Sequence, residues 1–379
     1  MKQHYDYIIL GAGCAGLSLL VRILGEKELA QKKILLVDRQ VKNLNDRTWC
    51  FWEKEPGYFE SILHHQWDKL WVKHPRGDLD LRLSGYSYKL IRGIDFYQYC
   101  FKKINASKQV TLVYGEVTDI DAATGQVSVD GTRYEGTQLF SSILLDVPQL
   151  KPKDLYLLQH FKGWWIETET DVFDPQQADL MNFRTSQKHG CAFVYLLPVS
   201  PRRALVEYTL FTEKALEDVE YDEGLRNFIK NELQLNDYRI TETEQGIIPM
   251  TTYKFAESKD RVVFIGTAGG QTKASTGYTF QFIQRQANAI VDKLKSGQPL
   301  EKMAQTPGRF QFYDNVLLRV LYEKQYPGAD VFFDIFRKNK ADNVLSFLDN
   351  RSSFLQELGI MNATPQHKFI AAAIRQYFV

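Results

Sequence analysis

The sequence predicts a mixed α/β (α+β) fold that combines a parallel sheet, an inserted antiparallel sheet and a helical C-terminal region. Residues 5–37 run in the order strand, glycine turn, helix and strand, which is the order that builds a parallel sheet. The segments CAFVYLLPV and RALVEYTLF flank the turn SPRR, as two antiparallel strands would. The chain beyond Pro299 has a helical pattern rich in Phe and Tyr.

The remaining elements follow from the same periodicities. We predict strands at 5–10, 33–37, 110–114, 126–129, 191–199, 203–211 and 261–265, and helices at 17–24, 95–104, 221–233 and 279–294. The apolar run 142–145 is expected to join the first sheet, whereas NDRTWCFWE at 45–53 has no clear pattern. We expect a discontinuous cofactor domain (1–60, 92–150 and 255–300), a substrate domain (61–91 and 151–254) and a helical C-terminal region (301–379).

The composition is that of a folded protein without a strong overall charge. Lys and Arg number 47 against 46 Asp and Glu, which leaves a formal net charge of +1, so we expect no nucleic-acid partner. The four cysteines are widely spaced and the seven histidines lack a metal-ligand spacing, so we expect a reducing compartment and no metal. Without a signal-peptide pattern or a long apolar run, the chain is expected to be cytoplasmic, and peripheral contact with the inner face of a membrane stays open.

The first glycine motif predicts a Rossmann-like dinucleotide site. In GAGCAG, Gly11 permits a tight turn, Gly13 lets the backbone approach a pyrophosphate, and Gly16 lets the helix pack on the strand. Ala12, between the first two glycines, is also expected to contact the cofactor. The N-terminus of that helix would hold the phosphates. Asp38 follows 22 residues after Gly16, at the end of the second strand, where a carboxylate can accept hydrogen bonds from a ribose diol.

A second glycine loop favours FAD over NAD, because it returns about 250 residues later between another strand and helix. The N-terminal N–H groups of that helix would face an anion or a flavin carbonyl, although an ordinary glycine-rich connection also fits. The residues of this loop that we expect to contact the cofactor are Gly266, Thr267, Gly269, Gly270 and Gly277. Arg47 could also reach the flavin or the pyrophosphate with its planar fork of donors.

Five stretches together resemble the bacterial lycopene β-cyclase family. They are DYIILGAGCAGLSL, NDRTWCFWE, LMNF with FVYLLPVSPRRALVEYT, EQGIIPMT and GTAGGQTKASTGYTF, and they span residues 6–280 in the family's order. Related flavoprotein hydroxylases usually carry Gly-Asp in the second loop, where this chain has Gly266 and Thr267. The resemblance therefore favours the cyclases and implies an FAD-binding fold of the p-hydroxybenzoate hydroxylase/glutathione reductase type.

The resemblance also implies the reaction. A reduced FAD, kept reduced by NAD(P)H, would stay bound while lycopene or a related linear carotenoid is cyclised through γ-carotene to β-carotene without net oxidation. Such chemistry adds a proton to a terminal double bond, closes the ring on the resulting cation and removes a different proton. The acidic residue that is essential in the family falls on Glu207, so the resemblance assigns the catalytic acid to this residue.

The residues alone leave the position of Glu207 open. Protonating an alkene requires a carboxylic acid that burial keeps protonated near neutral pH. On an alternating strand, Glu207 shares a face with Leu205, while Val206 and Tyr208 share the other, and the alternation does not say which face meets solvent.

Several other side chains also have two interpretations. Glu244 is either a second carboxylate, acting as a base, or a surface turn residue, and Lys273 either pairs with a reduced flavin or is solvated. The aromatic residues of 45–53 line a flavin or polyene surface, or pack in the core. The C-terminal aromatic and apolar side chains either face lipid or form a helical core: Phe332, Phe333, Phe336, Phe347 and Leu348.

Two other function classes stay open beside the cyclase. One is a redox flavoenzyme, either an aromatic hydroxylase or an isoprenoid reductase, and the other is a flavin- or carotenoid-binding protein without catalysis. The sequence leaves open whether one or both ends of the substrate are cyclised, which carotenoids are accepted, and the oligomeric state.

Overall fold

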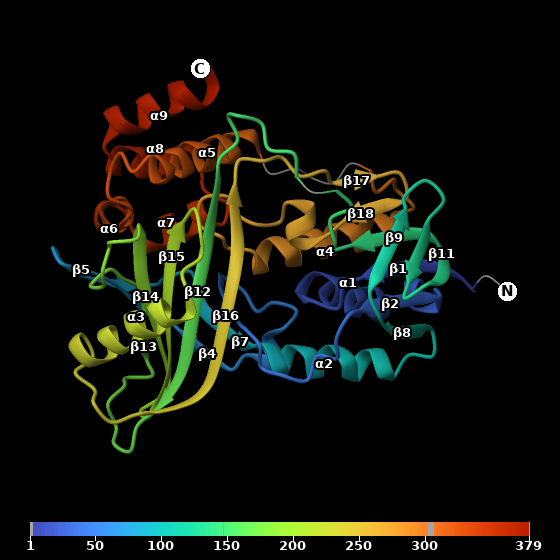
Figure 1. The fold of residues 1–379 in the computed structure, drawn as a ribbon, viewed down its shortest axis with the longest axis horizontal. Helices are drawn as coiled ribbons and strands as arrows, with labels where there is room; N and C mark the ends of the chain where they lie inside the picture. The colour runs from blue at the N-terminus through green and yellow to red at the C-terminus, as the bar shows by residue number, and fades with distance from the viewer. Residues whose placement is uncertain (1–2, 147, 302–306, 379) are drawn as a thin grey trace.

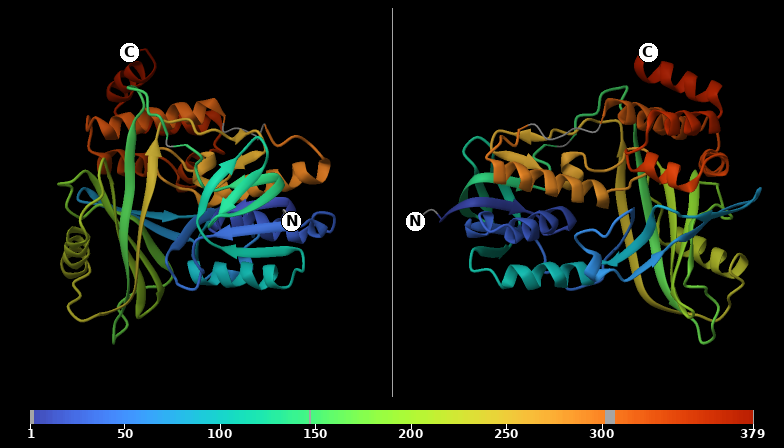
Figure 2. Two further views of the ribbon diagram at one scale, coloured as in Figure 1. Left: turned by 45° about the vertical axis from the view of Figure 1, so that its right-hand side comes forward. Right: turned by 180° about the vertical axis from the view of Figure 1, so that it is seen from behind.

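The computed structural model describes residues 3–146, 148–301 and 307–378. It has a mixed α/β architecture in which a mostly parallel sheet lies at one end and a long antiparallel sheet lies at the other (Figure 1). The helical C-terminal region covers one end and one face of the antiparallel sheet (Figures 1 and 2). The predicted fold class is therefore confirmed.

The first sheet contains the strand, turn, helix and strand unit at the start of the chain. Its strands lie in the order β17, β18, β11, β1, β2 and β8, and β10 joins β11 to β9. Pairing is parallel from β18 to β8, as buried strands linked by helices require. The bounds of the strands are β1 Gln3–Leu10, β2 Ile34–Asp38, β8 Val110–Tyr114, β9 Val117–Asp121, β10 Gln126–Val129, β11 Thr132–Ser141, β17 Ser258–Lys259 and β18 Val262–Phe264.

Helices cover one face of this sheet and the β9–β10 hairpin covers the other. Ile9 and Leu36 pack against the helices α1 (Cys14–Gly25), α2 (Gly93–Asn105) and α4 (Phe280–Ser296), whereas Ile8 and Leu35 pack against the hairpin. Successive residues of a strand point to opposite faces, so the continuous apolar run of β1 supplies both cores. Short 3-10 helices lie at η1 (Leu29–Gln31) and η2 (Glu60–Ile62).

The predicted strand at 142–145 is wrong. The sheet is continued instead by β11, which ends at Ser141, and the chain then turns away. The hydroxyl of Ser141 donates to the carbonyl of Ile143 at 2.7 Å, and the hydroxyl of Ser142 donates to the carbonyl of Leu10 at 2.8 Å. The local bond from Ser141 competes with ladder hydrogen bonds and favours a turn, and the bond from Ser142 holds the start of this turn to the end of β1.

The second sheet has the strand order β16, β12, β15, β14, β13, β5 and β6, and its pairing is antiparallel except between β13 and β5. A small antiparallel sheet, β3, β7 and β4, lies beside it. The helix α3 (Asp218–Asn231) covers the outer face of the second sheet, against Val206 and Tyr208. The strands of these two sheets are β3 Thr48–Glu53, β4 His65–Trp67, β5 Lys69–His74, β6 Gly77–Arg82, β7 Ser87–Arg92, β12 Tyr156–Glu167, β13 Gln177–Asn182, β14 Cys191–Ser200, β15 Arg203–Thr212 and β16 Arg239–Thr251.

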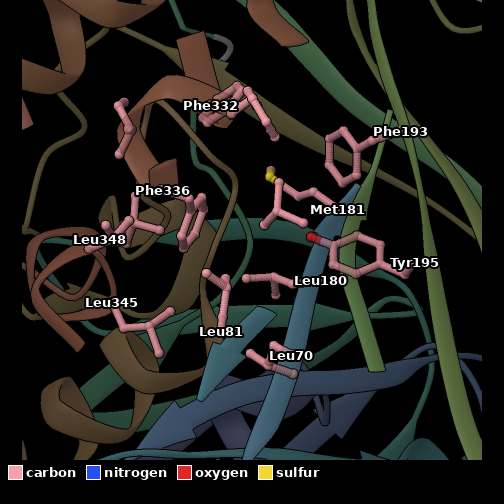
Figure 3. Packing of buried hydrophobic residues seen from close by; sticks show 14 of the residues in the cluster. Leu70, Leu81, Leu180, Met181, Phe193, Tyr195, Phe332, Phe336, Leu345 and Leu348 are labelled. Carbon is pink, nitrogen blue, oxygen red and sulfur yellow. The ribbon is translucent and has the colours of Figure 1, made fainter. Parts of the chain in front are cut away.

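The C-terminal helices pack on the inner face of the second sheet. Figure 3 shows Phe332, Phe336 and Leu348 facing Met181 and Phe193 of that sheet. The helices are α5 Gly308–Tyr322, α6 Gly328–Lys338, α7 Ala341–Leu348, α8 Phe354–Ala363 and α9 Gln366–Phe378.

The lipid-facing interpretation of Phe332, Phe333, Phe336, Phe347 and Leu348 is wrong, because each is at most 8% exposed. They form the core between helices and sheet, so the core interpretation holds. Within the described part of the chain, no helix is both long enough and apolar enough to cross a bilayer.

Candidate active site

A cavity of about 630 Å³ lies between the two glycine loops and the inner face of the second sheet. The start of α1, the strand β3, the residues before α4 and the strands β12 and β14 to β16 supply its walls. Of the residues predicted to form the site, six line this cavity: Gly13, Arg47, Glu207, Gly266, Thr267 and Gly277. The fold therefore brings the predicted acid and both glycine loops to one chamber.

The two glycine loops touch each other. A Cβ atom on Gly266 would lie 2.8 Å from the Cβ of Ala15, and Gly266 has a φ of +61° that disfavours other residues. A Cβ on Gly16 would lie 1.9 Å from the carbonyl oxygen of Gly11, so only glycine lets α1 begin this close to the preceding turn. Beside Gly13 there is open space, which leaves its backbone free to face a ligand.

Asp38 holds the first loop from the end of β2. One of its carboxylate oxygens accepts a hydrogen bond from the backbone N–H of Ala12 at 2.6 Å, and the other accepts from the N–H of Gln40 at 3.0 Å. The ammonium group of Lys42 lies 3.2 Å away. The carboxylate is thus fixed beside the loop at the position where the motif predicts a ribose contact.

The second loop divides its residues between two cavities. Gly266 and Gly277 face the large chamber, whereas Gly269 and Gly270 line a smaller cavity on the other side of the loop. Lys273 also faces the smaller cavity. The solvated interpretation of Lys273 is wrong, because its side chain is fully buried and its Nζ lies 2.7 Å from an Asp314 oxygen.

The aromatic segment 45–53 forms the strand β3 and has mixed roles. Trp49 lines the chamber, whereas Phe51 stacks on Phe280 with ring centroids 4.3 Å apart, and Trp52 is buried in the core. The core interpretation is therefore confirmed for Phe51 and Trp52, and a flavin or polyene contact of Trp49 stays a prediction. Arg47 lies at the margin of the chamber, and its Nη2 donates to Asp46 at 2.9 Å.

Glu207 lies on the inner face of β15, with Leu205. The outer face, with Val206 and Tyr208, is covered by α3, so neither face of this strand meets bulk solvent. The side chain of Glu207 is partly exposed, and this exposure is to the chamber that it lines. The structure thereby decides the question that strand alternation left open.

Glu244 lies beside Glu207 and is not a surface residue. It is 4% exposed on β16, and the hydroxyl of Thr48 donates to its Oε2 at 2.6 Å. Both glutamates pair in register with Gly163, which sits between them on β12. The turn interpretation of Glu244 is therefore wrong, because its strand continues from 239 to 251.

The two carboxyl groups have raised proton affinities. Burial raises the pKa of Glu207 well above its usual range, and the neighbouring negative charge of Glu244 raises it further. Burial also raises the pKa of Glu244, but the hydrogen bond from Thr48 opposes that shift. A carboxylic acid that stays protonated near neutral pH is the group that alkene protonation requires.

Aromatic hydroxyl groups surround Glu207 on the chamber side. The hydroxyl groups of Tyr195 and Tyr278 are 3.3 Å apart, and burial raises the pKa of both phenols. Tyr88 and Trp49 line the same chamber. The chamber therefore combines an acid with electron-rich aromatic faces, which stabilise cations.

Sequence reasoning missed Thr48, Gly163, Tyr195 and Tyr278. Each comes from a different strand or loop. The available signal was that Thr48, Tyr195 and Tyr278 lie within stretches that carry the family resemblance, but these stretches do not say which side chains meet Glu207.

Comparisons with known proteins agree with this architecture. A family model described as lycopene cyclase protein matches residues 6–374. A lycopene β-cyclase from Pantoea ananas is 24% identical over 304 residues, which cover 78% of this chain and 75% of that protein.

Two solved structures share the fold. A triple mutant of a flavin-dependent brominase has a TM-score of 0.64 at 13% identity, covering 96% of this chain and 99% of that one. The p-nitrophenol 4-monooxygenase of Pseudomonas putida has a TM-score of 0.61 at 11% identity, covering 97% and 99%. The predicted p-hydroxybenzoate hydroxylase type of fold is thereby confirmed.

Proposed function

We propose, from the premise that this chain belongs to the lycopene cyclase protein family, that it is a lycopene β-cyclase. It would convert the linear ends of lycopene, or of a related carotenoid, into β-ionone rings by acid–base chemistry, through γ-carotene to β-carotene. The observation that carries this proposal is a glutamic acid with a strongly raised pKa inside a chamber with aromatic walls.

Glu207 is the proposed acid. Its proton is transferred to the terminal double bond of the substrate, which leaves a tertiary cation. The neighbouring double bond attacks this cation and closes the ring, and loss of a different proton from the ring gives the product, so that no atom or electron is gained overall. The aromatic faces of Trp49, Tyr195 and Tyr278 supply cation–π stabilisation without offering a strong nucleophile.

The residues of the two glycine loops fit a bound FAD. Open space beside Gly13, the contact between Gly266 and Ala15, and the carboxylate of Asp38 at the first loop together form a cradle for a dinucleotide. When bound in its reduced form, with NAD(P)H as the electron donor, FAD would supply negative charge near the cation. In this proposal residues 1–60, 92–150 and 255–300 serve the cofactor, and residues 61–91 and 151–254 serve the substrate.

Expression in a lycopene-accumulating bacterium, with pigment analysis, tests the reaction and the substrate together. The wild-type chain should convert linear pigment into cyclic products. Glu207→Gln should lower the rate by about 100-fold or more, the usual contribution of a general acid, while flavin remains bound. Glu167→Gln is the matched control, because Glu167 pairs with Arg239 on the same sheet but does not line the chamber. Substantial cyclisation by the Glu207 variant would contradict the assignment.

A redox flavoenzyme is the second candidate, and the fold shared with a monooxygenase and a brominase favours it. The two candidates differ in their use of reductant. A cyclase turns over without oxygen and without stoichiometric NAD(P)H, whereas a hydroxylase consumes both. The non-catalytic alternative required a solvent-exposed Glu207, and this residue instead faces the chamber.

We also propose peripheral membrane contact, through residues other than those first considered. The helices α8 and α9 expose Phe354, Leu355 and Ile370, at 62%, 80% and 59%. We propose that these side chains belong to a contiguous apolar patch, because such patches are typical of an interaction surface. Flotation with phosphatidylcholine and phosphatidylglycerol vesicles should recover the wild-type chain with the lipid and lose the variant in which Phe354 and Leu355 are serine. Equal flotation of both proteins would exclude this surface.

A further inference from the structure

We propose that Glu244 is a positioning residue that shares one proton with Glu207 and keeps that proton on the Glu207 side. This inference rests on the proposed function and assigns a role to a second carboxyl group. The geometry points to it first. Glu244, Gly163, Glu207 and Tyr195 form one register row across four neighbouring strands of the second sheet.

Gly163 is what lets the two glutamates meet. A Cβ atom at this position would lie 3.0 Å from the Cγ of Glu244 and 3.5 Å from the Cβ of Glu207. Any larger residue would therefore occupy the space over the central strand through which the two side chains approach each other. Glycine inside a strand weakens it, so its presence here fits a need for close approach.

The hydrogen-bond donors are distributed unequally between the two carboxyl groups. Glu244 receives the Thr48 hydroxyl at 2.6 Å, whereas Glu207 receives the Thr209 hydroxyl at the longer distance of 3.2 Å. Stronger donation stabilises the ionised form, so the negative charge belongs on Glu244.

One oxygen of Glu244 still requires a donor. Among the described residues, its buried Oε1 has no hydrogen-bond partner, and the indole N–H of Trp165 lies nearby but outside hydrogen-bond geometry. A buried carboxylate oxygen without a donor is costly. Protonated Glu207 can supply that donor, whereas ionised Glu207 would place two negative charges side by side.

The surroundings favour the same distribution of charge. Glu207 faces the chamber that an apolar substrate would fill, whereas Glu244 lies at the floor of a recess on the outer edge of the sheet, next to the exposed Leu44 and Gln245. An apolar substrate would displace water from Glu207, which favours the neutral form of its carboxyl group.

Other ionisable groups near the pair do not supply a counter-ion to it. Cys50, Tyr195 and Tyr278 face Glu207, and each has a raised pKa and stays neutral near pH 7. Around the recess, Lys162 pairs with Asp222, Arg47 pairs with Asp46, and Arg92 and Arg203 pair with Glu242. Within the described residues, no lysine or arginine forms an ion pair with Glu207 or Glu244.

Glu244→Gln tests the proposal through the pH dependence of cyclisation. The active form has Glu207 protonated, so kcat falls as pH rises through the pKa of Glu207. The substitution removes the neighbouring negative charge and adds an amide N–H that stabilises ionised Glu207, so the falling limb of kcat should move to lower pH. A displacement of one pH unit lowers kcat about tenfold on that limb, with KM unchanged. Glu167→Gln should leave both unchanged.

A second measurement does not depend on turnover. Infrared spectra of the flavin-loaded protein at pH 7 should show the carbonyl band of a protonated carboxylic acid. Glu207→Gln should remove the part of this band that belongs to the acid. In Glu244→Gln that part should disappear at a lower pH than in the wild type, and in Glu167→Gln at the wild-type pH. An acid band in Glu244→Gln that disappears at the wild-type pH, or a falling limb of kcat at that pH, would overturn the proposal. An inactive wild-type chain that nevertheless shows these infrared changes would instead refute the proposed function.

Thr48 provides a second route if Glu244→Gln does not fold. Thr48→Val removes the donor that holds the charge on Glu244, so the proton should move from Glu207 toward Glu244. For each unit by which the pKa of Glu244 rises relative to that of Glu207, kcat should fall by about tenfold. Thr48→Ser retains the hydroxyl and should restore the rate. Equal rates for the valine and serine variants would contradict the shared proton.

Discussion

The buried ion pair behind the second glycine loop gives a quantitative prediction for Lys273→Met. The side chain of Lys273 is fully buried, that of Asp314 is 8% exposed, and their charged atoms are 2.7 Å apart. At an effective dielectric constant of about 20 their attraction is roughly 6 kcal/mol. Removing one partner leaves a buried charge unpaired, so we expect the free energy of unfolding to fall by about 3–5 kcal/mol.

The consequence for the site follows from the backbone of the same loop. The N–H of Lys273 donates to the carbonyl of Tyr278 at 2.9 Å, and the N–H of Gly277 donates to the carbonyl of Lys273 at 2.8 Å. Loosening Lys273 should therefore disturb the loop that lines the chamber and weaken flavin binding.

Urea unfolding followed by tryptophan fluorescence measures the stability, and flavin absorbance after gel filtration measures cofactor retention. Lys254→Met is the matched control, because Lys254 is exposed at the same small cavity and should change stability by less than about 0.5 kcal/mol. Replacing both partners, as in Lys273→Met with Asp314→Leu, should recover most of the lost stability. A single variant as stable as the Lys254 control would refute the reasoning.

Three further predictions concern other positions. Gly163→Ala should separate the two glutamates, because its Cβ would lie 3.0 Å from Glu244, and should cost about 1–3 kcal/mol of stability; a wild-type kcat in this variant would contradict the close approach. Gly266→Val should push the glycine loops apart at Ala15, 2.8 Å away, so that purified protein loses its flavin absorbance; full retention would be the opposing result. Burial lowers the pKa of His160 to about 4. The contribution of neutral His160 to the free energy of unfolding should therefore be fully present above pH 6.5, and about 3 kcal/mol of it should be lost as the pH falls to 4. In His160→Phe, the denaturant concentration at the midpoint of unfolding should no longer show this decrease between pH 6.5 and pH 4.

Local patterns placed seven of the eighteen strands and four of the nine helices in the described part of the chain. The strand, glycine turn, helix and strand unit of β1, α1 and β2 was predicted because each step rests on neighbours within a few residues. The antiparallel pair β14 and β15 was predicted from the turn at Pro201 for the same reason. The prediction for 142–145 failed because the side chain of Ser141 closes a local turn with Ile143, which the apolar content of the run does not reveal.

The sequence by itself determined which chemical groups this chain carries. It has two glycine loops with an acidic residue after the first, and a glutamate to which the family resemblance assigns the role of the acid. Only the tertiary structure decided that Glu207 faces a chamber, that Glu244 stands beside it, and that Lys273 is a buried partner of Asp314. The physical reason is that burial and charge pairing depend on which strands and helices cover each face. Residues as distant in the chain as Thr48 and Glu244 set those contacts, and periodicity along one segment carries no information about them.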